Sequence, residues 1–235
     1  MCPYNLEFDL PDNVDKILQE IKDIANMSPF ILLSHPFAFS IFDEIQKLGR
    51  STNKITINKF LYRARSYEVN KKYTGDDFKY PPRYKIAEGR FNHSGMPALY
   101  LADDVATCFC ELRRPASGIA FAEIKINDPL KILDLFDINN DCNSLLNVAA
   151  WSSLISSPEE GDGWYKPQYV FTRFVADCAV AAGFDGIKYP SVRRNSKYNI
   201  VLLNGLAAWD NITIININSM MAKSCIELLN RQFYQ

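Results

Sequence analysis

The segment from residue 89 to residue 111 constrains the fold of this chain more than any other. It reads GRFNHSGMPALYLADDVATCFCE, which is a turn of small polar residues, then an apolar strand at Ala98 to Leu101, then a helix from about Asp104 to Arg113. Asp103 stands where a residue would cap that helix. The pattern predicts a short strand that leads directly into a helix, so side chains from both elements can meet without being sequence neighbours.

Arg90, Tyr100 and Glu111 occur in this segment at spacings of ten and eleven residues. A guanidinium group can hold a diphosphate with two hydrogen bonds, and a tyrosine ring can lie against a base or a sugar. A carboxylate can stabilise an oxocarbenium ion as it forms. Glu111 is expected to project towards whatever Tyr100 faces. Together the three residues indicate a nucleotide-sugar site, with the groups needed to break the glycosidic bond of NAD.

Five short motifs follow one another in a fixed order along the chain. They are Tyr62-Arg63, Gly89-Arg90-Phe91-Asn92, Leu99-Tyr100-Leu101-Ala102, Glu111, and Tyr189-Pro190-Ser191 ahead of Asn199-Ile200-Val201-Leu202. In this order the motifs resemble the pattern of the RES domain family, which is named for Arg, Glu and Ser. The resemblance covers about residues 60 to 205. Phe91 stands where the family usually has Trp, and residues 1 to 59 have no counterpart in its short members.

The RES resemblance implies a fold and a substrate. Family members look like the catalytic core of ADP-ribosyltransferase toxins, so we expect the α+β class, with a curved, split β-sheet and helices around an NAD cleft. NAD+ would be the substrate, and no metal would be required. The implied NAD-binding residues are Arg63, Arg90, Asn92, Tyr100, Ser191 and Asn199, and the implied catalytic residues are Arg90, Tyr100, Glu111 and Ser191.

The resemblance also implies a role for each residue. Arg63 and Arg90 would hold the diphosphate and the neighbouring ribose, and Tyr100 would pack against the nicotinamide or its ribose. Ser191 would supply one orienting hydrogen bond. Glu111 would stabilise the oxocarbenium-like transition state. No general acid is needed, because the nicotinamide ring is already cationic and leaves the anomeric carbon as a neutral molecule. The sequence does not decide whether the nucleophile is water, inorganic phosphate or a protein side chain.

A partner is implied as well. The chain looks similar to the toxin half of a bacterial toxin–antitoxin pair, in which NAD depletion or ADP-ribosylation of a protein arrests growth. Such toxins are usually neutralised by an antitoxin with an Xre-type DNA-binding domain, so an antitoxin of that type is an expected partner. A protein that accepts ADP-ribose is a further expected partner if the reaction is a transfer.

Composition argues against several other classes of protein. The 235 residues carry 26 basic and 27 acidic side chains, so no global charge attracts nucleic acid or an anionic membrane. No apolar run approaches the roughly 20 residues that a membrane span needs. The six cysteines include no CxxC pair, the histidines are His35 and His93, and the N-terminus lacks a signal-peptide pattern. We therefore expect a cytoplasmic protein without a metal site.

The remaining pattern predicts one domain with a helical appendage. An N-terminal helical extension is expected over residues 1–58 and the RES domain over residues 59–235. Helices are expected at 14–25, 36–48, 142–155, 168–182 and 220–229, with a polar loop at 156–167. Strands are expected at 60–65, 119–126, 130–136, 199–203 and 212–217, with 119–126 and 130–136 joined as a hairpin. Helices and strands intermingle without regular alternation, which favours α+β.

Two other functions fit parts of the same pattern. A non-catalytic nucleotide-binding or interaction protein would keep the cleft and lose turnover, and the intact set of Arg, Tyr, Glu and Ser residues counts against it. A glycosidase would require a second carboxylate as general acid, and no position supplies one. The N-terminal helices are expected to pack on the sheet or on a second copy of the chain, and the latter would make a homodimer.

Overall fold

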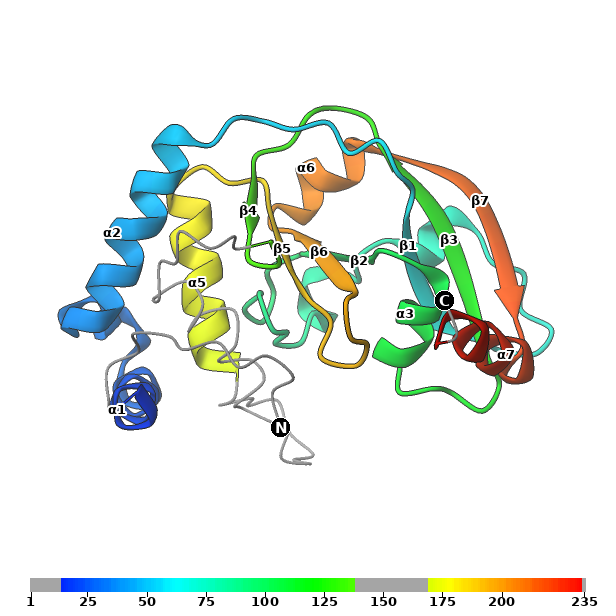
Figure 1. Ribbon diagram of the computed structural model, residues 1–235, viewed down its shortest axis with the longest axis horizontal. Helices are drawn as coiled ribbons and strands as arrows, with labels where there is room; N and C mark the ends of the chain where they lie inside the picture. The colour runs from blue at the N-terminus through cyan, green and yellow to red at the C-terminus, as the bar shows by residue number, and fades with distance from the viewer. Residues whose placement is uncertain (1–13, 138–168, 234–235) are drawn as a thin grey trace.

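The computed structural model describes residues 14–137 and 169–233 of the chain. These residues form a seven-stranded sheet with helices packed against it, which is an α+β arrangement (Figure 1). The fold class predicted from the sequence is therefore confirmed. The helix predicted at 142–155 and the loop predicted at 156–167 lie outside the described residues.

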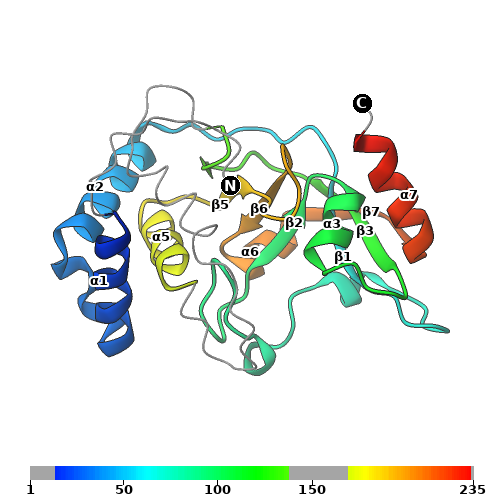
Figure 2. The same cartoon turned by 60° about the horizontal axis from the view of Figure 1, so that its bottom comes forward.

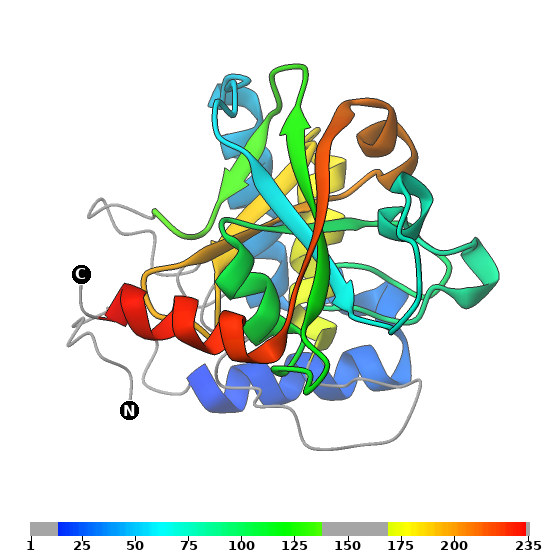
Figure 3. The ribbon, with the colours of Figure 1, turned by 90° about the vertical axis from the view of Figure 1, so that its right-hand side faces the viewer.

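The sheet is twisted and opens near its middle. In spatial order its strands are β4 (Ile132–Asp134), β5 (Gly186–Pro190), β6 (Tyr198–Leu202), β2 (Leu99–Ala102), β1 (Leu61–Ser66), β3 (Ile119–Ile126) and β7 (Ile212–Met220). Neighbours are antiparallel, except that β4 runs parallel to β5. β1 pairs with β3 along its whole length but with β2 only at Tyr62 and Ala102, so the sheet splits between β1 and β2. Figure 3 shows β1, β3 and β7 crossing the direction of β5 and β6.

Helices cover one face of the sheet in two groups (Figure 2). The first group is α1 (Val14–Met27), α2 (Pro36–Ser51) and α5 (Val170–Ala181), beside β5 and β6, and the second is α3 (Val105–Glu111) and α7 (Ala222–Phe233), beside β1, β2 and β3. The connections contain η1 (Pro29–Ser34), η2 (Gly75–Phe78), η3 (Arg83–Lys85) and α6 (Gly205–Asp210). Among the described helices, none has both the length and the apolar character to cross a membrane.

Alternation along β2 and β6 sends their side chains to opposite faces of the sheet. Leu99, Leu101, Ile200 and Leu202 are buried on the face away from α3 and α5, in a cluster with Phe78. The residues between them point to the helical face, where Tyr100 and Val201 join the α5 cluster and Ala102 joins the α3 cluster. The helical face therefore carries Tyr100 and Asn199 in the stretch between α5 and α3.

The N-terminal helices pack on α5 and share its hydrophobic core. Ile21 of α1 and both Ile41 and Ile45 of α2 are fully buried in one cluster with residues of α5 and β5. The ring centroids of Phe37 and Phe171 are 6.5 Å apart. α1 and α2 thus belong to the same packed body as the sheet.

The predicted hairpin at 119–126 and 130–136 was wrong. β3 pairs with β1 and β7, whereas β4 pairs with β5 at the opposite edge of the sheet. The predicted turn at residues 127–129 belongs to the connection that leads from β3 across the sheet to β4. β5 was not expected as a strand, although it supplies the parallel partner of β4 and leads directly into Ser191.

The prediction for the helix after β2 was also wrong in detail. Asp104, not Asp103, is the N-cap of α3, and its carboxylate accepts a hydrogen bond from the Thr107 N–H at 2.6 Å. The helix ends at Glu111, because Arg113 and Arg114 both take positive φ values. Glu111 is consequently the last helical residue, at the point where the chain turns away.

Two glycines at positive φ allow a matched test of backbone strain. Gly118 has φ +87° and Gly183 has φ +77°, but an added Cβ would collide with the Met220 carbonyl only at Gly118 and would meet nothing within 4 Å at Gly183. We expect Gly183→Ala to lower the free energy of unfolding by about 1 kcal/mol and Gly118→Ala by about 3 kcal/mol or more. Urea unfolding of both variants measures this difference, and equal losses would contradict it.

Candidate functional site

Five of the residues predicted for the site lie on or beside the helical face of the sheet, between α5 and α3. Asn199 lies on β6, Tyr100 on β2 and Glu111 at the end of α3. Ser191 follows β5 directly, and Arg90 lies in the turn that precedes β2. In Figure 2, α5 and α3 stand on either side of the strands that carry these residues. Segments far apart in the sequence therefore build one site.

Glu111 is held by two hydrogen bonds to one carboxylate oxygen. Ser191 Oγ donates to Glu111 Oε1 at 2.7 Å, and Asn199 Nδ2 donates to the same oxygen at 2.8 Å. Both donor residues are buried, whereas the Glu111 side chain is 31% exposed. The other oxygen, Oε2, lies 4.0 Å from Arg193 Nε, which is too far for a hydrogen bond. One oxygen is thus fixed by buried donors while the side chain stays accessible.

A second carboxylate ties the loop after Ser191 to the start of α3. Asp104 accepts hydrogen bonds from Arg194 Nη1 at 3.0 and 3.1 Å, and Lys197 Nζ lies 3.0 Å from it. Burial would raise the pKa of Asp104, but its hydrogen bonds and ion pairs hold that pKa below the ordinary value. α3 carries Asp104 at one end and Glu111 at the other. The same short helix therefore positions Ser191 and the carboxylate that Ser191 binds.

The turn before β2 is locked by Tyr100 and Asn92. The Tyr100 hydroxyl donates to Asn92 Oδ1 at 2.8 Å and accepts from the Phe91 N–H at 2.9 Å, and Asn92 Nδ2 donates to two backbone carbonyls of the turn. Gly89 is required because a Cβ there would collide with the Asn92 amide and the Tyr100 hydroxyl. Burial raises the pKa of Tyr100, which keeps its hydroxyl protonated as a donor. Tyr100 and Asn92 therefore fix the backbone on either side of Arg90.

Side chains of α5 hold the same turn from another direction. The contacts pair Thr172 Oγ1 with the Arg90 carbonyl at 2.5 Å, Arg173 with Glu88 at 2.9 Å, and His93 with Asp177 at 2.8 Å. Arg173 is buried, so its pairing with Glu88 is shielded from solvent. The turn is consequently bound both to β2 and to α5.

The Arg90 guanidinium lies near two tyrosine rings. Its Cζ is 5.7 Å from the ring centroid of Tyr169 and 5.7 Å from that of Tyr189, and Phe91 packs on Tyr189 with centroids 4.7 Å apart. Burial raises the pKa of Tyr189 well above its ordinary value, the charge of Arg90 opposes this rise and that of Glu111 adds to it. Arg90 therefore lies against this ring, and the charge of Glu111 acts on the same ring.

Arg63 is a buried cation that has no carboxylate partner among the described residues. Its Nη1 donates to the Tyr100 carbonyl at 3.0 Å, and its Nε has no hydrogen-bond partner. Burial, and to a lesser degree the nearby Arg65, lower the pKa of Arg63 to about 9. An unpaired buried charge is costly. Arg63, next to the split in the sheet, is therefore a candidate to bind an anion.

Arg65 and Cys108 lie near Arg63, but both serve the packing of the fold. Arg65 donates to the backbone carbonyls of Asp77 and Lys79 at 3.0 Å and so holds the loop before Gly89. Burial raises the pKa of Cys108, so its thiol stays protonated and packed. Within residues 14–137 and 169–233, no group of three or more His, Cys, Asp or Glu side chains is placed to hold a metal ion.

Some residues of the site were not expected to belong to it. Tyr169 and Tyr189 flank Arg90, and Asp104 with Arg194 fixes the Ser191 loop. Tyr189 occurs in the predicted Pro-Ser motif, so its proximity could have been inferred, but no local pattern links Asp104 to Arg194. Tyr100 was expected to pack against the nicotinamide or its ribose. In the structure its hydroxyl is hydrogen-bonded to the turn that carries Arg90.

Comparison with known proteins gives one match to a family. The sequence profile of the RES domain matches residues 60–218, which include every residue described above for the site. A search of the curated proteins finds no match. Among solved structures, the M. tuberculosis MbcT–MbcA toxin–antitoxin complex contains a similar chain with 15% sequence identity and a TM-score of 0.48. That similarity covers 78% of this chain and 96% of the other.

The lock on the Arg90 turn can be tested by removing one oxygen atom. Tyr100→Phe leaves the Phe91 N–H and the Asn92 side-chain oxygen Oδ1 without their partner in a buried setting. We therefore expect a loss of about 1–3 kcal/mol in the free energy of unfolding. Tyr84→Phe is the matched control, because Tyr84 is exposed and should change by less than about 0.5 kcal/mol. Thermal unfolding measures both variants, and unchanged stability in Tyr100→Phe would contradict the lock.

Proposed function

This chain belongs to the RES domain family, and from that premise we propose that it is an NAD+-consuming enzyme that cleaves the bond between nicotinamide and ribose. RES toxins act on NAD+. The observation that carries the proposal is the geometry of Glu111, whose Oε1 is fixed by Ser191 and Asn199 while the side chain remains partly exposed. A carboxylate held in this way has its charge in place before a reaction begins.

Glu111 would act on the transition state electrostatically. As nicotinamide departs, positive charge develops on the ribose, and a carboxylate beside the anomeric carbon stabilises that charge. Because Glu111 is already oriented, the reaction would not have to reorganise it. The cationic nicotinamide ring leaves without protonation, which agrees with a site that presents one oriented carboxylate.

Arg63 and Arg90 would bind the diphosphate. The unpartnered Nε of Arg63 supplies a donor that a phosphate oxygen would satisfy, and an anion beside it would compensate the buried charge. Arg90 would share this task from the turn, where Tyr169 and Tyr189 hold its guanidinium. Both charges act on Tyr100: burial raises its pKa, and both arginines oppose that rise. Both cations thus act on Tyr100, which supports the proposal that they bind one ligand.

The remaining predicted residues would act mainly by positioning. Tyr100 and Asn92 hold the Arg90 turn, so any contact of Tyr100 with the nicotinamide or ribose would come from its ring. Ser191 and Asn199 already donate to Glu111, and they would influence NAD+ chiefly through that carboxylate. These assignments keep the predicted residues in the site and specify what each one does there.

The proposal includes a biological setting. We expect a cytoplasmic toxin that an Xre-type antitoxin restrains, and the activity is NAD+ glycohydrolysis, phosphorolysis or mono-ADP-ribosyl transfer according to whether water, phosphate or a protein attacks the ribose. The alternative is a non-catalytic nucleotide-binding or interaction protein on the same fold. Turnover distinguishes them, since only the enzyme releases nicotinamide.

Replacement of Glu111 tests the proposed chemistry. Glu111→Gln keeps the size of the side chain and removes the charge, so nicotinamide release should fall by about a hundredfold or more while NAD+ binding is retained. Release is measured with and without inorganic phosphate, and a phosphate requirement would identify a phosphorylase. Glu68→Gln, on the exposed surface, is the matched control and should leave the rate unchanged. Wild-type protein that binds NAD+ without consuming it, alone or with candidate acceptor proteins, would favour the non-catalytic alternative.

Replacement of Arg63 tests the proposed anion site separately. Arg63→Met removes a buried unpaired charge, so NAD+ affinity should fall by about tenfold or more while the free energy of unfolding stays equal or rises. Arg65→Met is the matched comparison, because Arg65 donates to loop carbonyls and its loss should cost about 1–3 kcal/mol. Calorimetric titration with NAD+ and urea unfolding give the two quantities. A strong destabilisation by Arg63→Met would show that Arg63 serves the fold.

A further inference from the structure

An exposed apolar surface lies where α1, η1 and α2 join, at the opposite end of the molecule from α7 (Figure 1). We call it the N-terminal tip. It consists of Met27, Phe30, Ile31, Leu33 and Phe39. Phe30 is 96% exposed and Met27 is 82% exposed. Side chains of this size are seldom so exposed together, and such a patch marks an interaction surface.

The tip is anchored to the body of the protein. Leu32 lies between two exposed tip residues and is buried in the core shared by α1, α2 and α5. Phe37 and Ala38 are buried directly before Phe39, whose ring is 6.4 Å from that of Phe42. The exposed side chains therefore project from a packed support, which lowers the entropic cost of binding.

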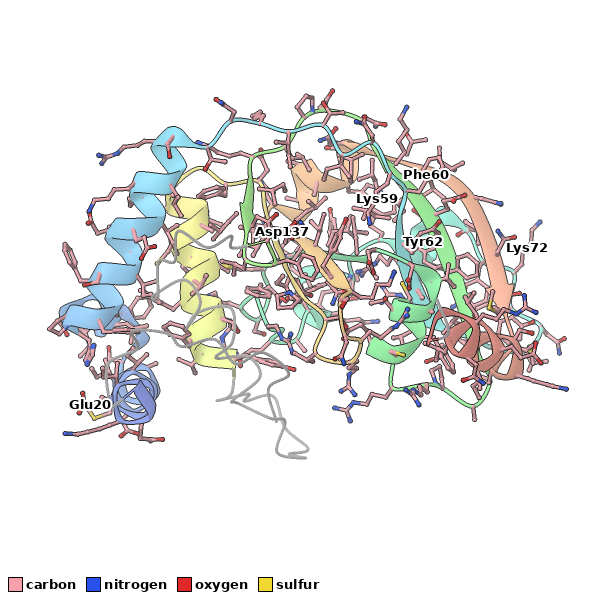
Figure 4. The ribbon with its side chains drawn as sticks, in the orientation of Figure 1. Glu20, Lys59, Phe60, Tyr62, Lys72 and Asp137 are labelled. Carbon is pink, nitrogen blue, oxygen red and sulfur yellow. The ribbon has the colours of Figure 1, made fainter. Side chains whose placement is uncertain are left out.

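The tip is uncharged, and the two helices that adjoin it carry charges of both signs farther along. Residues 24–42 contain no Lys, Arg, Asp or Glu. On α1, Lys16 pairs with Glu20 at 3.7 Å, and on α2, Lys47 pairs with Asp43 at 2.6 Å. Figure 4 labels Glu20 on α1 at this end of the molecule. Because this surface carries no uniform charge, it would not attract nucleic acid or an acidic protein electrostatically.

We propose that the N-terminal tip is the contact surface between two copies of this chain. A twofold axis would place the same apolar patch on both sides, and an uncharged patch meets its copy without like-charge repulsion. Because α1 and α2 carry both lysines and carboxylates, a lysine of one copy can face a carboxylate of the other.

The size of the tip fits such a contact. A large exposed side chain presents roughly 150–250 Å² when aromatic, so five partly exposed residues offer on the order of 600 Å². A standard interface buries about 800 Å² on each partner, which the rim would complete. None of the tip residues belongs to the site around Glu111, so the pairing does not depend on the proposed reaction.

The mass of the full chain in solution tests the proposal. Sedimentation velocity over a wide range of protein concentration should show a dimer for the wild type. Phe30→Asp should raise the dimer dissociation constant by at least about tenfold, because a charge would be buried against its own copy. Phe39→Asp should act in the same direction. Phe60→Asp is the matched control, since Phe60 is also exposed and lies ahead of β1, away from the tip (Figure 4).

Two results would overturn the proposal. One is a wild-type chain that stays monomeric at all concentrations, which would include the case where the tip binds a different protein. The other is a dimer that Phe30→Asp and Phe60→Asp weaken equally. Because the Phe30 side chain touches little of the fold, circular dichroism should show folded variants, and mass then reports on association alone.

Discussion

The two hydrogen bonds on Glu111 Oε1 are the interaction on which the site depends. They join the end of α3, the residue after β5 and a residue of β6 at one oxygen atom. The sheet register makes this meeting possible, because Asn199 pairs with Tyr189 on one side and with Ala102 on the other. A slip of one residue along β6 would send Asn199 to the opposite face and leave Glu111 without its donor. The order and register of the strands therefore decide whether the Glu111 carboxylate receives its hydrogen bonds.

Electrostatic strain is concentrated at one buried cation of β1. Arg63 and Arg65 lie two residues apart on β1, yet Arg65 has two carbonyl acceptors for its guanidinium and Arg63 has one. Burial lowers the pKa of both, to about 9 for Arg63. Folding therefore tolerates a poorly compensated charge next to the split between β1 and β2. A buried charge of this kind is expected where it serves a ligand, and this is why Arg63 is the proposed anion-binding residue.

Local patterns in the sequence predicted the parts of the site that lie within one segment. The strand and helix around Tyr100 and Glu111 follow from apolar spacing and an aspartate cap, and the motif order leads to the RES family, which the profile match confirms. The predictions failed where the pairing of strands that are distant in the sequence determines the structure. β5 contains Gly186, Lys188 and Pro190, which weaken a strand signal, and it forms because β4 and β6 flank it. Asp103, the first of two adjacent aspartates, was likewise predicted to be the cap. The structure uses Asp104, which also binds Arg194, a contact that no spacing reveals.

The distances along the chain between Glu111 and its donors have a consequence for the protein's synthesis. Ser191 and Asn199 follow Glu111 by 80 and 88 positions. A ribosome-bound chain that ends before β6 contains the carboxylate but neither the register nor the amide that orients it. The hydrogen bonds on Glu111 can therefore form only when most of the polypeptide has emerged, and shorter fragments lack them. For an enzyme proposed to consume a nucleotide that its own cell requires, this order of assembly would delay activity until the chain has been made through β6.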